Sequence, residues 1–145
     1  FYPRNKNEKS KERLGYYMSP ELACAQQGVG LHYFDGRDAT LKGTYNKRAN
    51  LIIVDSYLDD IEKKKVIYHE LGHKDHNPAN YERCREQYEA QADRNMIYHL
   101  LKEELSHWDK DELENFNYIN FLQKYNLKTT INESMVKEEF FNLID

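Results

Sequence analysis

The chain has 145 residues, of which 39% are hydrophobic and 32% are charged, with a formal net charge of −4. This composition supplies one modest core, so we expect a single domain over residues 19–145 behind a flexible leader at residues 1–18. The longest aliphatic run, Leu51–Val54, is far shorter than the roughly 20 residues of a membrane-spanning helix. The net negative charge argues against nucleic-acid binding, because neutralising phosphates requires clustered Lys and Arg. We therefore expect a cytoplasmic protein without membrane or direct nucleic-acid contacts.

The predicted elements begin with a short helix. Ser19 can cap this helix, Pro20 suits its first position, and Gly28 stops it. Three extended segments then predict a small three-stranded sheet. They cover residues 29–34, 41–45 and 51–54.

From Asp59 onward the pattern is helical. Asp59 and Glu62 resemble a capping box, and the helix that follows is expected to run to about His73 or His76. A further helix, capped by Asn80, is predicted over 81–105, and the C-terminal part at 106–145 is predicted to form helices at about 111–125 and 132–143. The predicted fold class is thus α+β, with a small three-stranded sheet packed with a helical majority.

One motif carries most of the chemistry, namely the H-E-x-x-H arrangement His69-Glu70-Leu71-Gly72-His73. Four residues on an α-helix span about 400° and about 6 Å, so His69 and His73 project from one face and can bind one ion, with zinc the best suited. Glu70 lies about 100° around from His69, where its carboxylate can take a proton from bound water. Gly72 lets another backbone pass close by.

A catalytic zinc site also needs a third protein ligand and an open position. Glu89 and Asp93 stand four residues apart on one face of the next predicted helix. We expect Glu89 to bind the metal and Asp93 to accept the free ring N–H of a ligand histidine, His69. Glu86 and Glu82 are alternative third ligands and rank lower.

The other chemically interesting side chains have simpler interpretations. His76 is interpreted as a helix C-terminal residue favoured by the helix dipole rather than as a ligand. Cys24 and Cys84 are expected to be inert buried thiols. Core or surface roles are favoured over oxyanion stabilisation for four further residues. These are His99, His107, Tyr81 and Tyr88.

The sequence resembles the ImmA/IrrE family of metallopeptidases over about residues 20–105. Three pieces carry the resemblance, namely Leu41–Tyr45, then Asn50–Asp55 leading into Val66–His73, and finally Glu89–Asp93 followed by Leu100-Leu101. It implies a thermolysin-like zincin core of the gluzincin type, with one zinc ion per chain on His69, His73 and Glu89, and with Glu70 as the base. It also implies that the enzyme cleaves a helix-turn-helix repressor of a phage or mobile element. The sequence departs from the family pattern after H-E-x-x-H, where the next histidine comes one position early.

Two functions are compatible with these residues. The leading hypothesis is a zinc-dependent endopeptidase of narrow specificity that acts as an anti-repressor. The alternative is a non-catalytic, metal-bound interaction protein that sequesters a repressor or acts in a toxin-antitoxin pair. A purely structural zinc site has no use for Glu70 and normally has four protein ligands, whereas three are visible here. Manganese or iron can occupy similar sites.

Overall fold

The structure, a computed structural model, describes residues 19–144, without the side chains of residues 129–131. Residues 1–18, predicted to form a flexible leader, lie outside the described residues. The described chain divides into two compact units, Pro20–Ile97 and a second one that begins at Tyr98. Helix α4 (Tyr81–Leu105) contributes residues to both units.

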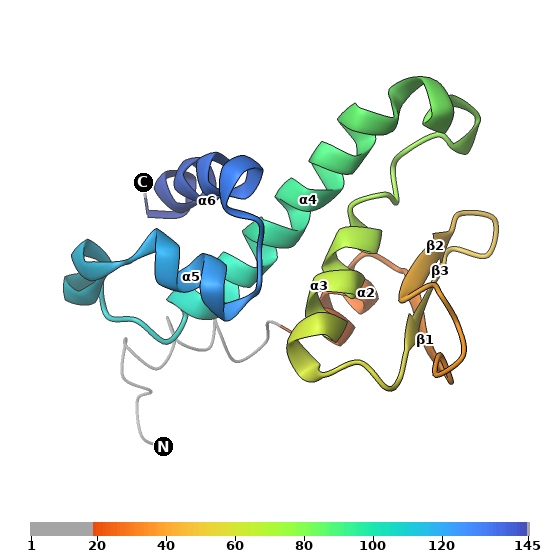
Figure 1. The fold of residues 1–145 in the computed structure, drawn as a ribbon, viewed down its shortest axis with the longest axis horizontal. Helices are drawn as coiled ribbons and strands as arrows, with labels where there is room; N and C mark the ends of the chain where they lie inside the picture. Colours follow the sequence, from red (N-terminus) through yellow and green to blue (C-terminus); the bar gives the residue numbers. More distant parts are fainter. Residues whose placement is uncertain (1–18, 145) are drawn as a thin grey trace, which may run out of the picture. The chain divides into compact units, whose positions relative to one another are not determined.

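The first unit contains a three-stranded sheet (Figure 1). Its strands are β1 (Gly30–Phe34), β2 (Gly43–Asn46) and β3 (Leu51–Asp55). The central strand β3 runs parallel to β1 and antiparallel to β2. Ile52 and Val54 of β3 are fully buried, because alternate residues of a strand point to the same face. The sheet and the helical majority confirm the predicted α+β class.

Two helices cover one face of this sheet (Figure 1). Helix α2 (Pro20–Gln26) contacts β1, and α3 (Asp60–Leu71) contacts β2 and β3. Asp59 begins α3 as predicted, since its carboxylate accepts the Glu62 N–H at 2.8 Å. The Glu62 carboxylate pairs with Lys65 at 3.0 Å. The buried side chains of α3 are Ile67, Tyr68 and Leu71.

The second unit is helical, but one of its predicted helices is wrong. Residues 111–125 form a 3-10 helix, η3 (Lys110–Asn115), and then a separate helix, α5 (Tyr118–Lys124). Asn117 causes the break, because its side chain accepts the N–H groups of Ile119 and Asn120 and so starts a new helix. Helix α6 (Thr129–Ile144) is longer than the predicted 132–143. The core of this unit includes Leu122, Val136 and Phe140.

The two cysteines differ in their surroundings. Cys24 is fully buried, and this burial, with the nearby Glu21, raises the pKa of its thiol to about 11. Cys84 is partly exposed at a residue of α4 with non-helical backbone angles (φ −109°, ψ 18°). The prediction of a buried thiol is therefore confirmed for Cys24 and wrong for Cys84, which lies at a kink instead of on a packed helix face.

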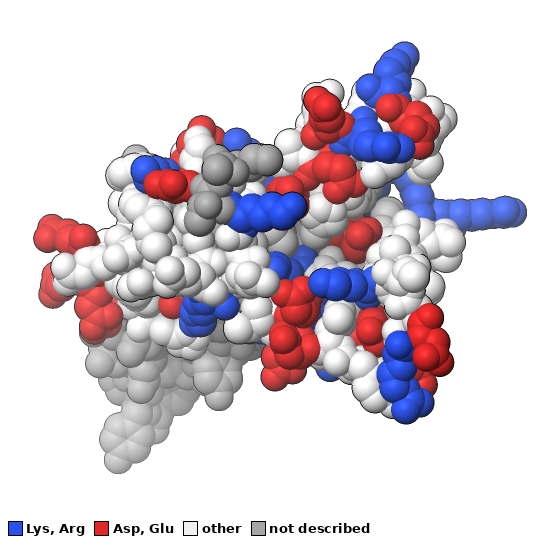
Figure 2. Space-filling view, in the orientation of Figure 1, with Lys and Arg blue, Asp and Glu red and all other residues white. Residues whose placement is uncertain are grey.

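Positively and negatively charged side chains are mixed on the face that Figure 2 shows. Lys and Arg side chains are interspersed there with Asp and Glu side chains. Among the described residues, no helix combines the length and the apolar character that crossing a membrane requires.

A buried histidine in α4 is expected to make the stability of the protein depend on pH. His99 is 9% exposed, and its burial, with the charge of Lys102, lowers the pKa of its imidazole from 6.5 to about 4. Between these values the unfolded chain binds a proton at His99 and the folded chain does not, so acidification favours unfolding.

We therefore expect His99 to lower the free energy of unfolding by roughly 2 kcal/mol as the pH falls from about 7.5 to about 5. Because glutamine does not titrate, His99→Gln should reduce the pH dependence by that amount. Denaturant unfolding of both proteins at the two pH values measures the difference. Identical pH dependence in wild type and variant would contradict the prediction.

Candidate metal centre

The two motif histidines lie on either side of the end of α3. Helix α3 ends at Leu71, between His69 and His73, and the turn that follows is tighter. The His73 N–H donates to the Glu70 carbonyl at 3.0 Å, and the Lys74 N–H donates to the Leu71 carbonyl at 3.2 Å. These are bonds to the third preceding residue, typical of a 3-10 turn. The Nε2 atoms of His69 and His73 nevertheless lie 3.3 Å apart.

Helix α4 brings a carboxylate to these two nitrogens. Glu89 Oε2 lies 2.9 Å from His69 Nε2, and Glu89 Oε1 lies 3.3 Å from His73 Nε2. One ligand atom from each of the three residues lies within 4.8 Å of the others, an arrangement that can hold a metal ion. Of the two alternative ligands, Glu82 pairs with Arg85 at 2.8 Å and Glu86 is exposed, so the structure brings neither to the histidines.

Asp93 lies one helical turn beyond Glu89 and contacts the other side of the His69 ring. Its Oδ1 atom is 2.9 Å from His69 Nδ1. An ionised carboxylate can only accept, so the ring donates its Nδ1–H, and the Nε2 lone pair faces Glu89 and His73. Burial lowers the pKa of His69, but the hydrogen bond and charge of Asp93, together with the charges of Glu70 and Glu89, outweigh it and the pKa is raised. The pKa of His73 is lowered, because burial outweighs the charge of Glu89.

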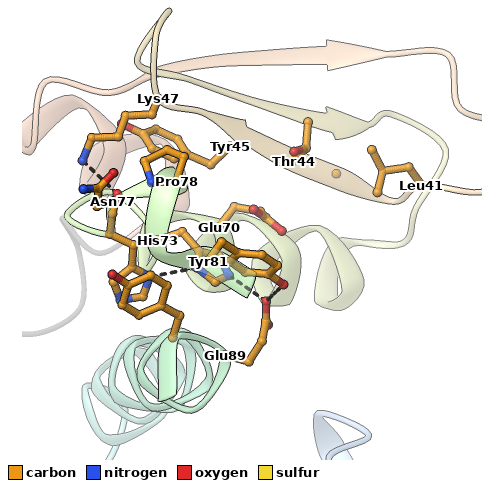
Figure 3. A pocket seen from close by; sticks show the side chains of 13 residues that line it. Leu41, Thr44, Tyr45, Lys47, Glu70, His73, Asn77, Pro78, Tyr81 and Glu89 are labelled. Carbon is orange, nitrogen blue, oxygen red and sulfur yellow. Dashed lines mark hydrogen bonds and ion pairs between the residues drawn. The ribbon is translucent and has the colours of Figure 1, made fainter. Parts of the chain in front are cut away.

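Glu70 lies beside the three candidate ligand side chains instead of among them. Burial raises the pKa of its carboxyl, partly offset by the charge of His69 and by the Tyr45 backbone N–H, which donates to it. A carboxylate with a raised pKa is a better proton acceptor near neutral pH. Figure 3 shows Glu70 next to strand β2, with His73, Tyr81 and Glu89 meeting to one side of it.

Strand β2 offers an open edge to this centre. Its register pairs Thr44 with Ile53, and the Asp55 N–H donates to the Lys42 carbonyl, so even-numbered residues of this stretch hydrogen-bond to β3. Tyr45 and the other odd-numbered residues of β2 therefore turn their backbone groups away from β3, where the Tyr45 N–H donates to Glu70 and the other groups face the open edge. This is the geometry in which an extended peptide can add to a sheet.

Two hollows flank the centre and share Glu70. One has a volume of about 290 Å³ and is lined by His73, Glu89 and aromatic side chains that include Tyr45, Tyr81 and Tyr88 (Figure 3). The other has a volume of about 270 Å³ and is lined by His69, Lys65, Val66 and Met96, among others. A chain laid along β2 would thus find space on both sides of the catalytic candidates.

Two residues of the centre were not predicted from the sequence. The Tyr81 hydroxyl donates to Glu89 Oε1 at 2.7 Å, and its ring stands edge-on to His73 with centroids 6.4 Å apart. His76 lies after the end of α3, so its interpretation as a helix-terminal residue is wrong, and its Nδ1 atom is 3.0 Å from His73 Nδ1. Neither position follows from helical periodicity, because the chain reverses direction between α3 and α4.

A close backbone approach fixes the distance between the two segments that carry the candidate ligands. A Cβ atom added at Gly72 would lie 2.7 Å from the Ala92 Cα and 3.1 Å from the Asn95 Cβ. Asn95 also donates from its side chain to the Tyr68 carbonyl at 2.8 Å. The suggestion that Gly72 admits another backbone is thus confirmed, and the backbone it admits is that of α4.

Gly72→Ala should push α4 away from the end of α3, because the obstructing atom belongs to a backbone and cannot rotate aside. Gly72 has helical angles (φ −65°, ψ −16°), so the added methyl itself causes no backbone strain. We expect Gly72→Ala to lower the free energy of unfolding by about 1–3 kcal/mol. We also expect it to weaken metal binding, since Glu89 and Asp93 move with α4. Denaturant unfolding and elemental analysis measure the two effects. Wild-type metal content and stability in this variant would contradict the close-approach argument.

Comparison with known proteins places the chain in a family. Residues 24–135 match the model of the M78 peptidases, described as the IrrE N-terminal-like domain. No curated protein and no solved structure shows significant similarity to the chain. The match covers well over half of the sequence and includes the whole cluster of His69, His73 and Glu89. The chain therefore belongs to the M78 peptidases and is a metallopeptidase of the ImmA/IrrE type.

Proposed function

We propose that this protein is a zinc-dependent endopeptidase of narrow specificity that cleaves a phage or mobile-element repressor and thereby relieves repression. One observation carries the peptidase part of the proposal. Ligand atoms of His69, His73 and Glu89 converge, while the Glu70 carboxylate is held outside this cluster by its own hydrogen bond to β2. A site built only to hold metal would have no need for such a separate carboxylate.

The donor set fits zinc. Two nitrogens that bind one ion at about 2.0–2.1 Å in a tetrahedral arrangement stand about 3.3–3.4 Å apart. The Nε2 atoms of His69 and His73 are 3.3 Å apart. Two imidazoles and one carboxylate leave a fourth position for water or substrate, which is the ligand count of gluzincin-type catalytic sites. We therefore propose one zinc ion per chain on His69, His73 and Glu89.

A bound zinc ion would supply Lewis-acid polarisation of the scissile carbonyl and of a water molecule. The Glu70 carboxylate would accept a proton from that water and pass it to the amide nitrogen of the leaving product. Its burial and its hydrogen bond to the Tyr45 N–H fix the position from which it does so. The Tyr81 hydroxyl, which donates to Glu89 Oε1 at 2.7 Å, would hold that carboxylate in its orientation.

The open edge of β2 would hold the substrate in an extended conformation. The edge passes directly beside Glu70, and the two hollows on either side can take side chains of the substrate. Both hollows are small, and their linings differ, because one includes several tyrosines and the other includes both apolar and charged side chains. Such different linings favour a narrow range of cleavage sites over general proteolysis.

The repressor substrate is proposed from the family to which the chain belongs. We propose a helix-turn-helix repressor as the partner, with DNA recognition left to that partner, since the chain has a net charge of −4. Enzyme and repressor would then meet in the cytoplasm, without a membrane.

The metal assignment can be tested on α4 with two neighbouring glutamates. We expect Glu89→Ala to abolish zinc binding, since it removes one of three ligands, and Glu86→Ala to leave it near wild type, since Glu86 is exposed. Zinc content by elemental analysis and affinity by chelator competition provide the readouts. Equal zinc loss in both variants, or loss only in Glu86→Ala, would refute the ligand set.

The catalytic assignment requires a variant that keeps the metal. Glu70→Gln retains size and hydrogen bonding but cannot accept a proton, so zinc content should stay near wild type. Cleavage of a co-expressed candidate repressor should fall by roughly a hundredfold or more.

His73→Ala is the matched control, because it should lose zinc and activity together. If Glu70→Gln instead lost zinc in parallel with activity, Glu70 would be a ligand and not the base. If repressor cleavage persisted unchanged in Glu70→Gln, the protein would not be a peptidase of the proposed mechanism.

A further inference from the structure

The geometry points to His76 as the residue that orients the metal ligand His73 and sets its tautomer. This inference rests on the metal site of the proposed function. It assigns a role to a histidine that lies three residues after the H-E-x-x-H motif and outside any helix.

The His76 imidazole is held on three sides. Its Nδ1 atom lies 3.0 Å from His73 Nδ1, and its Nε2 atom lies 2.6 Å from the side-chain oxygen of Gln91 on α4. Its ring stacks on Tyr88, also on α4, with centroids 3.9 Å apart and planes 6° from parallel. These contacts leave the ring little freedom to turn, so the direction of its Nδ1 atom is fixed.

The hydrogen bonds define one consistent set of proton positions. The oxygen of Gln91 can only accept, so His76 Nε2 carries a hydrogen and donates it. In a neutral imidazole, His76 Nδ1 is then an acceptor, and it must receive its hydrogen from His73 Nδ1. His73 therefore keeps its lone pair on Nε2, the atom that faces Glu89 and His69.

His69 is held in the same tautomer by a chemically different partner. Asp93 accepts the Nδ1–H of His69 at 2.9 Å, whereas His73 has a neutral imidazole in the corresponding place. Both ligand rings thus present Nε2 to the centre, and both are oriented from α4, through Asp93 for one and through Gln91 and Tyr88 for the other.

The backbone at His76 is anchored independently of its side chain. The Lys47 ammonium donates to the carbonyls of His76 at 2.9 Å and of Lys74 at 3.0 Å. Immediately afterwards Asn77 caps the short helix η2 (Pro78–Asn80) by accepting the Ala79 N–H at 3.1 Å. Replacing the His76 side chain should therefore leave the loop in place, so that variants report on the ring and not on folding.

Two substitutions separate the hydrogen bond from the aromatic stack. His76→Phe keeps a ring on Tyr88 but has no acceptor for His73. His76→Asn loses the ring but can place its Oδ1 atom where the imidazole has Nδ1. We expect His76→Phe to weaken zinc binding by about tenfold to a hundredfold and His76→Asn to remain within about threefold of wild type.

Zinc affinity of the full chain is measured by competition with a chromogenic chelator, and the unfolding temperature of the metal-free proteins checks that they are folded. Wild-type affinity in His76→Phe would overturn the inference. An equal loss in both variants would overturn it as well, because it would assign the effect to the stack on Tyr88 alone. Absence of zinc binding in wild type would refute the proposed metal site, and the inference would fail as stated.

A second measurement needs no metal. Nitrogen-15 NMR correlation spectra of the imidazoles, recorded on metal-free protein at about pH 8, distinguish the two tautomers directly. We expect His73 to carry its hydrogen on Nδ1 in wild type and His76→Asn, and to show a mixture of tautomers in His76→Phe. The same mixture in wild type would overturn the inference, whatever the zinc affinity.

Discussion

The geometry of the candidate metal centre depends on the contact between the end of α3 and the middle of α4. Gly72 and Ala92 bring the two backbones so close that no side chain fits between them at that point. The contact lies between the candidate ligand residues on both segments, because Gly72 stands between His69 and His73 in sequence and Ala92 stands between Glu89 and Asp93. The positions of all four side chains therefore follow from one backbone distance, which the Asn95 side chain reinforces by its bond to Tyr68.

Much of this centre could be predicted because it obeys short-range rules. The four-residue spacings within H-E-x-x-H and between Glu89 and Asp93 are properties of helical geometry, which the sequence displays directly. The same holds for the start of α3 at Asp59, whose side chain makes a local bond, and for β3, whose run of aliphatic residues needs a buried position. The roles of these residues in metal binding and catalysis remain predictions that the proposed experiments address.

What could not be predicted depends on how the chain turns. The position of His76 against His73 requires α3 to end at Leu71 and a tighter turn to follow, and no periodic pattern records that change. Tyr81 reaches Glu89 because a single turn of 3-10 helix precedes α4. In the second unit, Asn117 looks like an ordinary polar residue within a helical pattern, yet its side chain competes with the backbone and divides the helix.

The end of α3 between the two histidines also makes them unequal partners of any bound ion. His69 belongs to the regular hydrogen-bonded part of the helix, whereas the His73 N–H is bonded only within the tighter turn. Such turns open locally at much lower free energy than the body of a helix unless tertiary contacts hold them. Here these contacts are the Lys47 ammonium, which donates to the carbonyls of Lys74 and His76, and the close approach of Gly72 to Ala92. The geometry at His73 would thus depend on contacts from outside its helix, whereas the geometry at His69 would depend on the helix itself.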